Sequence, residues 1–394
     1  MNKIKLMLCF LAIFPATMLM SCQGSQSYIG TFSAKLAFYE NFTDLIPINA
    51  DMIYDSSSVE EFDLAELAEL LALDETEYLS DTVPHGHLAV SFIEFMNDNL
   101  YNRTPFTYRE KEAADWIVDE LLAMGHDSEN IFVQEFNKSE LGIDYLFSRS
   151  NSSFFGNAVL RDYSQNIILT VPGESKKTII VSAHYDTVST YSGASDNASG
   201  TSLLLESAWR ILEKDNYYTI VYIFFGAEEL GLIGSHYYVD NLTDYERDNI
   251  LFIVNADVLF EGPHLVYGAG FEDNGKAQEN SISRQVDEIA QNIYDNYDIS
   301  IAPVTISIFL PSDQLPFLWD GHTVVQIWGA YLPEKNDYQA RVIQTYGDLR
   351  LAGRVLHSEK DDFHYINENW PGKIDTAMWS FSVFLEEILF ANYD

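Results

Sequence analysis

The chain has 394 residues, of which 47% are hydrophobic and 14% aromatic. It can therefore bury a large core and form one large domain with a smaller part, or two domains. Its 60 acidic residues outnumber its 22 Lys and Arg and give a formal net charge of −38. Phosphate backbones bind clustered Lys and Arg, so this charge excludes a nucleic-acid-binding protein. We interpret the acidity as a surface property that maintains solubility.

The N-terminus is predicted to be a targeting segment. Lys3 and Lys5 precede the apolar run Leu6–Met20, which is placed like the hydrophobic region of a signal peptide and is short for a membrane span. The next motif, LMSC, resembles a bacterial lipoprotein box, in which Cys22 becomes the lipidated first residue after removal of residues 1–21. The alternative is an ordinary signal peptide cleaved nearby. We therefore expect an exported protein, lipid-anchored to the periplasmic or surface side of a bacterial membrane or otherwise secreted.

The predicted cleavage divides the chain into a signal segment, an N-terminal tether and a main domain. Cys9 lies in the signal segment, so Cys22 is the one cysteine of the mature chain and no disulfide forms. Residues 22–84 comprise a small polar tether and an acidic stretch, in which Ser58–Leu73 has helical periodicity. Residues 85–394 are expected to form the main domain.

Short apolar runs alternate with amphipathic stretches along this main domain. The apolar runs predict buried strands over Asn166–Val171, Thr178–Ala183, Ile220–Phe225 and Ile250–Val254, the first two separated by a turn at PGESKK. Helical periodicity predicts helices over Tyr108–Met124, Ala198–Leu212, Ala277–Tyr294 and Ile374–Phe390. Nearly continuous apolar strands that alternate with helices indicate a layered α/β domain with a largely parallel sheet. Ligands of such sheets bind at the carboxyl ends of the strands.

Side chains able to bind a metal follow two of the predicted elements. His184 and Asp186 come directly after a strand, and their spacing puts both on one side of an extended chain. Asp196 lies in a turn of small residues, where Gly193 and Gly200 allow the backbone to come close to what Asp196 binds. Each motif alone has an ordinary structural alternative, namely a hydrogen-bonded His–Asp pair and an Asp that caps a helix.

Three further groups contain candidate ligands, and the first two of them again follow predicted strands. Glu228 and Glu229 stand side by side after the strand Ile220–Phe225; two buried carboxylates need a positive charge or a proton, unless one is exposed at a helix start. Asp257 follows the next strand. A fifth group contains His357, Asp361, Asp362 and His364. Because these residues repeatedly follow strands, they predict a metal centre, and His with carboxylate ligands suits zinc or another borderline divalent ion.

Five motifs in this order carry a resemblance to a known family. HYDTV, GASDNASG, FGAEELGLIGS, NADV and HSEKD resemble the di-zinc aminopeptidase family, which also contains glutaminyl cyclases and glutamate carboxypeptidases. The resemblance extends from about His85 to the C-terminus and includes an Arg before the first helix, Arg103, and the Ser-Asp segment that starts at Ser312. Ser358 departs from the Thr that is usual in the last motif. The resemblance implies a three-layer α/β/α fold with a mostly parallel, mixed central sheet and a zinc peptidase catalytic domain over residues 85–394.

The resemblance also implies a role for each residue of the site. One zinc ion is expected to bind His184 and Asp257 and the other Glu229 and His357, with Asp196 bridging the two. Asp186 is expected to orient His184, and Glu228 to act as general base toward a water shared by the metals. His357 is favoured over His364 and His322 because its HxxxD spacing fits the family pattern.

The function implied is that of an exported zinc aminopeptidase that removes N-terminal residues from peptides with a free N-terminus. Three alternatives remain open: a glutaminyl cyclase, which uses one zinc ion; a carboxypeptidase, which needs a cation for the substrate carboxylate; and a catalytically silent binding protein. Candidate cations for a carboxypeptidase are Arg247, Arg284, Arg341, Arg350 and Arg354.

Overall fold

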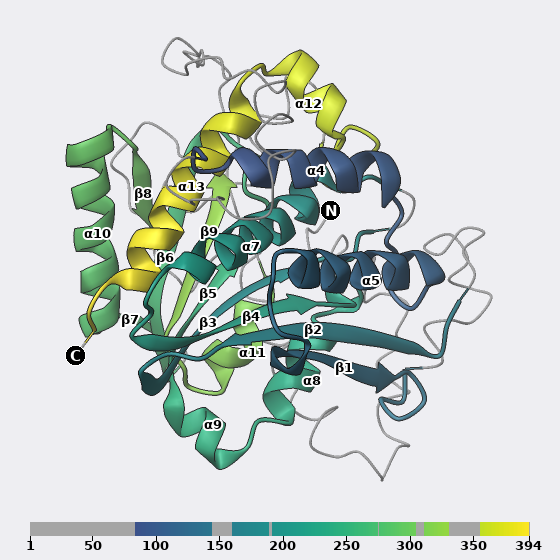
Figure 1. Cartoon of the computed structure of the whole chain (residues 1–394), viewed down its shortest axis with the longest axis horizontal. Helices are drawn as coiled ribbons and strands as arrows, with labels where there is room; N and C mark the ends of the chain where they lie inside the picture. Colours follow the sequence, from purple (N-terminus) through teal and green to yellow (C-terminus); the bar gives the residue numbers. More distant parts are fainter. Residues whose placement is uncertain are drawn as a thin grey trace.

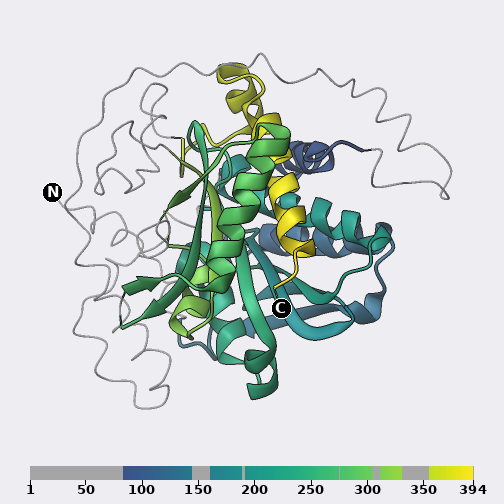
Figure 2. The same cartoon turned by 90° about the vertical axis from the view of Figure 1, so that its left-hand side faces the viewer.

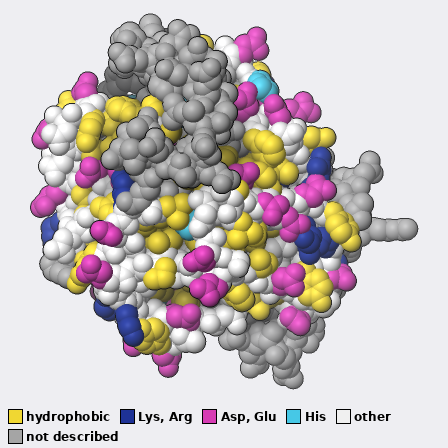
Figure 3. Space-filling model, viewed as in Figure 1, with side chains coloured by type: hydrophobic (Ala, Val, Ile, Leu, Met, Phe, Trp, Pro, Cys, Tyr) yellow, Lys and Arg dark blue, Asp and Glu magenta, His cyan; other side chains and the backbone are white. Residues whose placement is uncertain are grey.

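The computed structural model describes residues 83–143, 160–188, 191–274, 276–304, 311–330 and 355–393. The predicted signal segment, Cys22 and the helix over residues 58–73 lie outside these ranges, as do Arg341, Arg350 and Arg354. Among the described residues, no helix is long and apolar enough to cross a membrane. Acidic side chains are spread over the face shown in Figure 3, with few Lys and Arg among them, as the net charge predicts.

A mixed sheet forms the centre of the described chain (Figure 1). Its strands are β1 Ile131–Asn137, β2 Tyr163–Val171, β3 Ser175–His184, β4 Tyr218–Phe225, β5 Ile250–Ala256, β6 His264–Asp273, β7 Lys276–Gln278, β8 Ile301–Val304 and β9 Val324–Ala330. The order is β1-β2-β4-β3-β5-β9-β6-β7, with β8 paired to β6. The central strands β4, β3, β5 and β9 are mutually parallel, whereas β1, β2, β6 and β7 add antiparallel pairs on either side. The predicted α/β class with a mixed central sheet is thus confirmed.

Helices cover both faces of this sheet (Figures 1 and 2). One face packs against α4 His87–Asn99, α5 Tyr108–Ala123, α7 Ser199–Arg210, α10 Ser281–Tyr297 and α13 Lys373–Phe390, with α12 Phe363–Asn369 against α4 and α13. The other face packs against α8 Ile233–Asp240 and α11 Gln314–Trp319, beside α9 Asp244–Asn249. Successive side chains of β3 point to opposite faces of the sheet and so contribute to two cores. Ile179 and Val181 point into one core and Ile180 into the other.

One sequence prediction needs correction in detail, and another gains a detail. The strands on either side of the turn PGESKK exist, and β4 lies between them in the sheet. The chain crosses over through α7 and places β4 parallel to β3, because parallel neighbours need a long connection. The helix predicted from Ala277 begins at Ser281 instead, because residues 276–278 pair with β6 and Asn280 caps the helix by accepting from the Ser283 N–H.

A buried ion pair attaches the first described helix to the main core. The Glu206 carboxylate of α7 accepts hydrogen bonds from the N–H groups of Gly86 (2.7 Å) and Ala89 (2.9 Å), at the start of α4. It also accepts from the Ser382 hydroxyl (2.7 Å) and pairs with Arg210 Nε at 2.8 Å. Glu206 therefore caps α4 from a neighbouring helix, which replaces a cap that the local sequence lacks.

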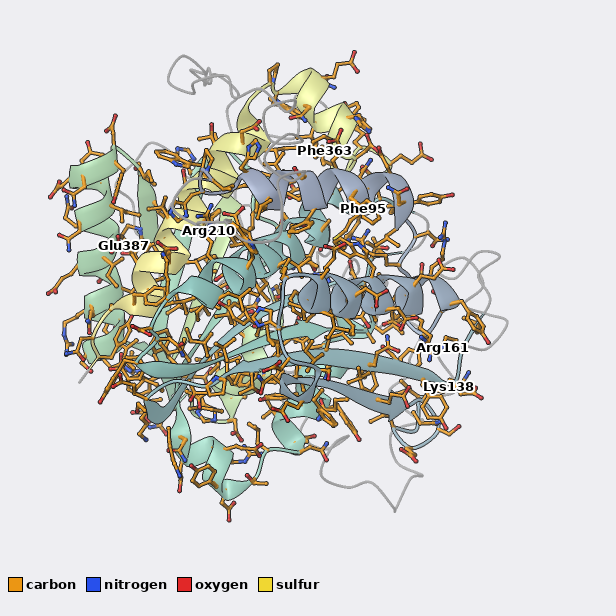
Figure 4. All side chains as sticks on the ribbon, viewed as in Figure 1. Phe95, Lys138, Arg161, Arg210, Phe363 and Glu387 are labelled. Carbon is orange, nitrogen blue, oxygen red and sulfur yellow. The ribbon has the colours of Figure 1, made fainter. Side chains whose placement is uncertain are left out.

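Glu206→Gln is expected to destabilise the protein by about 3–5 kcal/mol, because it leaves the buried Arg210 charge without its carboxylate partner. The measurement is the free energy of unfolding from a urea titration. The matched control is Glu387→Gln, an exposed position on α13 that Figure 4 labels together with Arg210. A change in Glu206→Gln as small as that of the control would contradict the capping role.

Candidate metal centre

The carboxyl edge of the parallel strands gathers the predicted site residues. His184 is the last residue of β3, and Asp257 follows β5 directly. Glu228 and Glu229 lie in a short helical turn after β4. Because β4, β3 and β5 are adjacent and parallel, their ends meet at one edge of the sheet. The structure therefore brings together residues that are far apart in the sequence.

His184, Asp196 and Asp257 form the first group of possible ligands. His184 Nε2 lies 3.2 Å from Asp196 Oδ1 and 3.2 Å from Asp257 Oδ1. One ligand atom from each residue lies within 4.8 Å of the other two, and all three side chains are buried. Such a group can converge on one ion.

A second group shares Asp196 with the first and adds Glu229 and His357. His357 Nε2 lies 2.9 Å from Asp196 Oδ2 and 3.5 Å from Glu229 Oε2. Asp196 thus directs one carboxylate oxygen toward each group. Glu228, next to Glu229, belongs to neither group of the described residues.

The turn that carries Asp196 is shaped by close backbone contacts. Asp196 does not cap α7, whose first residue follows Ala198, so the capping alternative is wrong. A Cβ at Gly200 would lie 2.3 Å from the Ala256 carbonyl oxygen, so this position requires glycine for a close backbone contact within the protein. The Asp361 carboxylate accepts from the N–H groups of Ser195 (2.6 Å) and Asp196 (3.1 Å) and so sets the orientation of the turn.

The Asp186 carboxylate is oriented mainly toward the glutamates. Its Oδ1 accepts from the Glu228 N–H (3.1 Å) and its Oδ2 from the Glu229 N–H (3.0 Å). His184 Nδ1 lies 3.5 Å from Asp186 Oδ1 and 3.2 Å from the Asp186 carbonyl oxygen. In this geometry the backbone of Asp186 is the nearer partner of His184, and its side chain holds the turn that contains Glu228.

The site carries an excess of buried negative charge. Burial raises the pKa of Glu229 and of Asp257, and the nearby Asp196 carboxylate raises both further. Burial lowers the pKa of His184, but the Glu228 and Asp257 carboxylates outweigh it and raise that pKa well above its usual value. Grouped buried carboxylates are stabilised by a cation, and imidazole and carboxylate donors without a thiolate fit zinc. The residues present therefore fit the metal that the sequence predicts.

The competing histidines lie elsewhere. His364 Nε2 is 2.8 Å from Asp98 Oδ1 on the surface, and His322 Nε2 is 3.1 Å from Asp320 Oδ2. Asp362 caps α12 by accepting from the Tyr365 N–H at 2.9 Å.

Sequence reasoning missed the function of Arg103. Its guanidinium is fully buried and donates to the carbonyl oxygens of Leu100, Tyr185, Ser192 and Gly193, at distances from 2.6 to 3.1 Å. It thereby joins the segment after His184 to the segment before Asp196. Burial lowers the pKa of Arg103 to about 10, so the group stays charged at neutral pH. Only its position before the predicted helix Tyr108–Met124 marked it in the sequence.

Comparisons with known proteins identify the family of the chain. Residues 166–382 match the sequence profile described as peptidase family M28. Aminopeptidase YwaD of Bacillus subtilis is 48% identical over 99 residues, which are 24% of this chain and 22% of that protein. The chain spans between about a fifth and a half of the length of the first curated relatives that it matches.

Two solved structures share the fold. The zinc aminopeptidase BSAP from Bacillus subtilis aligns with a TM-score of 0.59 and 19% identity, covering 79% of this chain and 96% of that one. A glutaminyl cyclase from Bacteroides thetaiotaomicron aligns with a TM-score of 0.53 and 19% identity, covering 79% and 100%. With the profile match over more than half of its length, the chain belongs to peptidase family M28.

Proposed function

We propose that this protein is an exported metallo-aminopeptidase that releases N-terminal residues from peptides and uses two zinc ions. Residues 85–394 form its catalytic domain, residues 1–21 a signal peptide of the lipoprotein type, and residues 22–84 a spacer from the membrane to which Cys22 is lipid-anchored. The observation that carries the proposal is the pair of ligand groups that share Asp196 at one edge of the sheet.

The two groups divide the metal ligands. His184 and Asp257 would hold one zinc ion, Glu229 and His357 the other, and Asp196 would contribute one carboxylate oxygen to each. When bound, zinc supplies Lewis-acid chemistry that polarises a carbonyl and lowers the pKa of water. Asp361, through the Ser195 and Asp196 N–H groups, would keep the shared carboxylate in place.

Glu228 would move the proton. Its carboxylate accepts a proton from the attacking water and returns it to the nitrogen of the leaving amine. Burial raises the pKa of Glu228 well above its usual value, and the Glu229 carboxylate adds to this rise, whereas His184 opposes it. Asp186 would fix the backbone of Glu228 and Glu229 and contact His184 from behind.

The charge of the site favours a substrate with a free amino group. Glu228, Glu229 and Asp257 provide negative charge that attracts an ammonium group. The described candidates for binding a substrate carboxylate serve elsewhere: Arg247 pairs with Asp320, and Arg284 is exposed on α10. The negative charge of the site therefore supports an aminopeptidase, and neither of the two described candidate arginines is available for a substrate carboxylate.

The test combines metal content with a substrate panel. We expect two zinc equivalents per chain and hydrolysis of aminoacyl-p-nitroanilides with a free amino group, lost with a chelator and restored by zinc. N-blocked analogues are the matched control and should not be cleaved. Cleavage of the blocked compounds or indifference to the chelator would contradict the proposal, and cyclisation of N-terminal glutamine without hydrolysis would identify a cyclase instead.

A further inference from the structure

The short segment Gly226–Glu229, called the base loop below, is held by side chains and not by neighbouring strands. Each of its four successive N–H groups donates to a side-chain oxygen. The pairs are Gly226 N with Asn166 Oδ1 (3.2 Å), Ala227 N with Glu110 Oε1 (3.2 Å), Glu228 N with Asp186 Oδ1 (3.1 Å) and Glu229 N with Asp186 Oδ2 (3.0 Å). All three acceptor residues are buried, and only Asp186 follows a strand that carries a metal-ligand candidate.

This support is needed because the base loop has an unfavourable backbone conformation. Ala227 has φ +57° and lies in the left-handed region, which a residue with a Cβ seldom adopts. Such a conformation persists when the surrounding structure determines it, and sites of chemistry are where it is found. Here it turns the chain between the end of β4 and Glu228. The direction of the Glu228 side chain therefore depends on how Ala227 is held: its carbonyl oxygen accepts from the Ile233 N–H (3.2 Å), and its own N–H donates to Glu110 Oε1.

Glu110 holds that N–H from a different part of the fold. It lies in the first turn of α5, and its side chain is fully buried. Its Oε2 accepts from the Phe106 N–H at 2.6 Å, whereas its Oε1 accepts from the Ser164 hydroxyl at 2.6 Å and from the Ala227 N–H at 3.2 Å. One carboxylate thus joins α5, β2 and the base loop. Because all three partners donate, an amide at this position would turn its NH₂ group toward a donor.

The same loop is closed on its other side by α8. Asn166 accepts from the Gly226 N–H and donates to the Gly234 carbonyl oxygen at 2.9 Å. A Cβ at Gly234 would lie 2.3 Å from the Gly226 carbonyl oxygen and 2.4 Å from Asn166 Oδ1. The first turn of α8 therefore packs directly on the base loop, which leaves Glu110 as the tie toward α5.

We propose that Glu110 is a positioning residue, which holds the Ala227 N–H and thereby directs the Glu228 carboxylate toward the reacting groups. It acts through the backbone and belongs to neither ligand group of the described residues. The inference rests on the proposed function where it names Glu228 as the base; the hydrogen-bonding role of Glu110 does not depend on the reaction.

The kinetic test uses Glu110→Gln, Glu228→Gln and the double variant. Glu110→Gln should lower kcat roughly 10- to 100-fold and leave KM and zinc content nearly unchanged, because a small displacement of a catalytic group costs rate and not binding. In the Glu228→Gln background the same change should lower the residual kcat by less than about twofold, since two residues that act through one group are not additive. The matched control, Glu112→Gln, is exposed on the same helix and should leave kcat unchanged.

The structural test is amide hydrogen exchange of the full-length protein, with and without zinc. Glu110→Gln should increase exchange in peptides that cover the base loop, while the central strand β3 keeps its protection. The proposal would be overturned if exchange in the base loop is unchanged. It would also be overturned if Glu110→Gln lowers kcat by the same factor in the wild type and in the Glu228→Gln background. If Glu110→Gln does not fold, Glu110→Asp replaces it, because it keeps the charge but shortens the reach to Ala227.

The two measurements separate this proposal from the proposed function. A wild-type protein without peptidase turnover would refute the function, yet hydrogen exchange would still decide whether Glu110 holds the base loop. Normal turnover with unaltered exchange in Glu110→Gln would refute the positioning role and leave the aminopeptidase assignment intact.

Discussion

Glu228→Gln is expected to lower kcat roughly 10²- to 10⁴-fold while the protein keeps its zinc. The amide has the size of the carboxylate but accepts no proton at neutral pH, and Glu228 belongs to neither ligand group of the described residues. The backbone N–H of residue 228 keeps its bond to Asp186, so the loop should stay in place. The measurements are kcat on a substrate with a free amino group and zinc per chain.

The matched control is Glu368→Gln, an exposed glutamate on α12 that should leave both values unchanged. A kcat in Glu228→Gln within about tenfold of the wild type would exclude Glu228 as the main general base. Loss of zinc from Glu228→Gln would show that it is a ligand, and the assignment of base and ligand among the two glutamates would then be exchanged.

Asp196→Asn is expected to remove zinc from both groups and to abolish activity. Asp196 approaches both histidines, at 3.2 Å from His184 and 2.9 Å from His357, so one substitution affects both groups. A neutral amide offers one oxygen and no charge to balance two cations. The zinc affinity should fall at least about 100-fold. Replacing a residue that only hydrogen-bonds to a metal ligand costs up to about 100-fold, and loss of a ligand itself should cost at least as much. Chelator competition measures it.

The control for charge is Asp298→Asn, an exposed residue at the end of α10. Two zinc equivalents bound to Asp196→Asn with unchanged affinity would rule out a bridging role. Loss of a single equivalent would show that Asp196 serves one group only.

Asp186 shows where prediction from the sequence reached its limit. The HxD spacing correctly indicated that both side chains lie near one another. It could not indicate that two N–H groups from the turn after β4 would occupy both carboxylate oxygens. Those donors lie in the turn that follows a neighbouring strand, and strand order is a property of the whole sheet.

The helix around Glu110 gives a second example. The helix runs from Tyr108 to Ala123, and the prediction ended it one residue later, at Met124. The agreement is close because helical periodicity is a local signal. In the sequence, Glu110 looks like the third residue of a helix that begins after Thr107 and suggests only a cap. Its bond to Ala227 joins positions 117 residues apart, and no local pattern encodes it.

The sequence by itself determined the class of fold and the approximate positions of β2 to β5, α5, α7, α10 and α13. The resemblance of its motifs supplied the candidate ligands His184, Asp196, Glu229, Asp257 and His357. Apolar runs, helical periodicity and short motifs are properties of short segments, so they can be recognised without knowing which distant segments will be in contact. Only the tertiary structure decided that β4 separates β2 from β3 and that Asp196 faces both ligand groups. It also decided that Arg103, Glu110 and Asp361 hold the loops of the site through backbone hydrogen bonds. Such contacts are decided by packing between distant segments, because a buried donor or acceptor takes whichever partner the fold brings within reach.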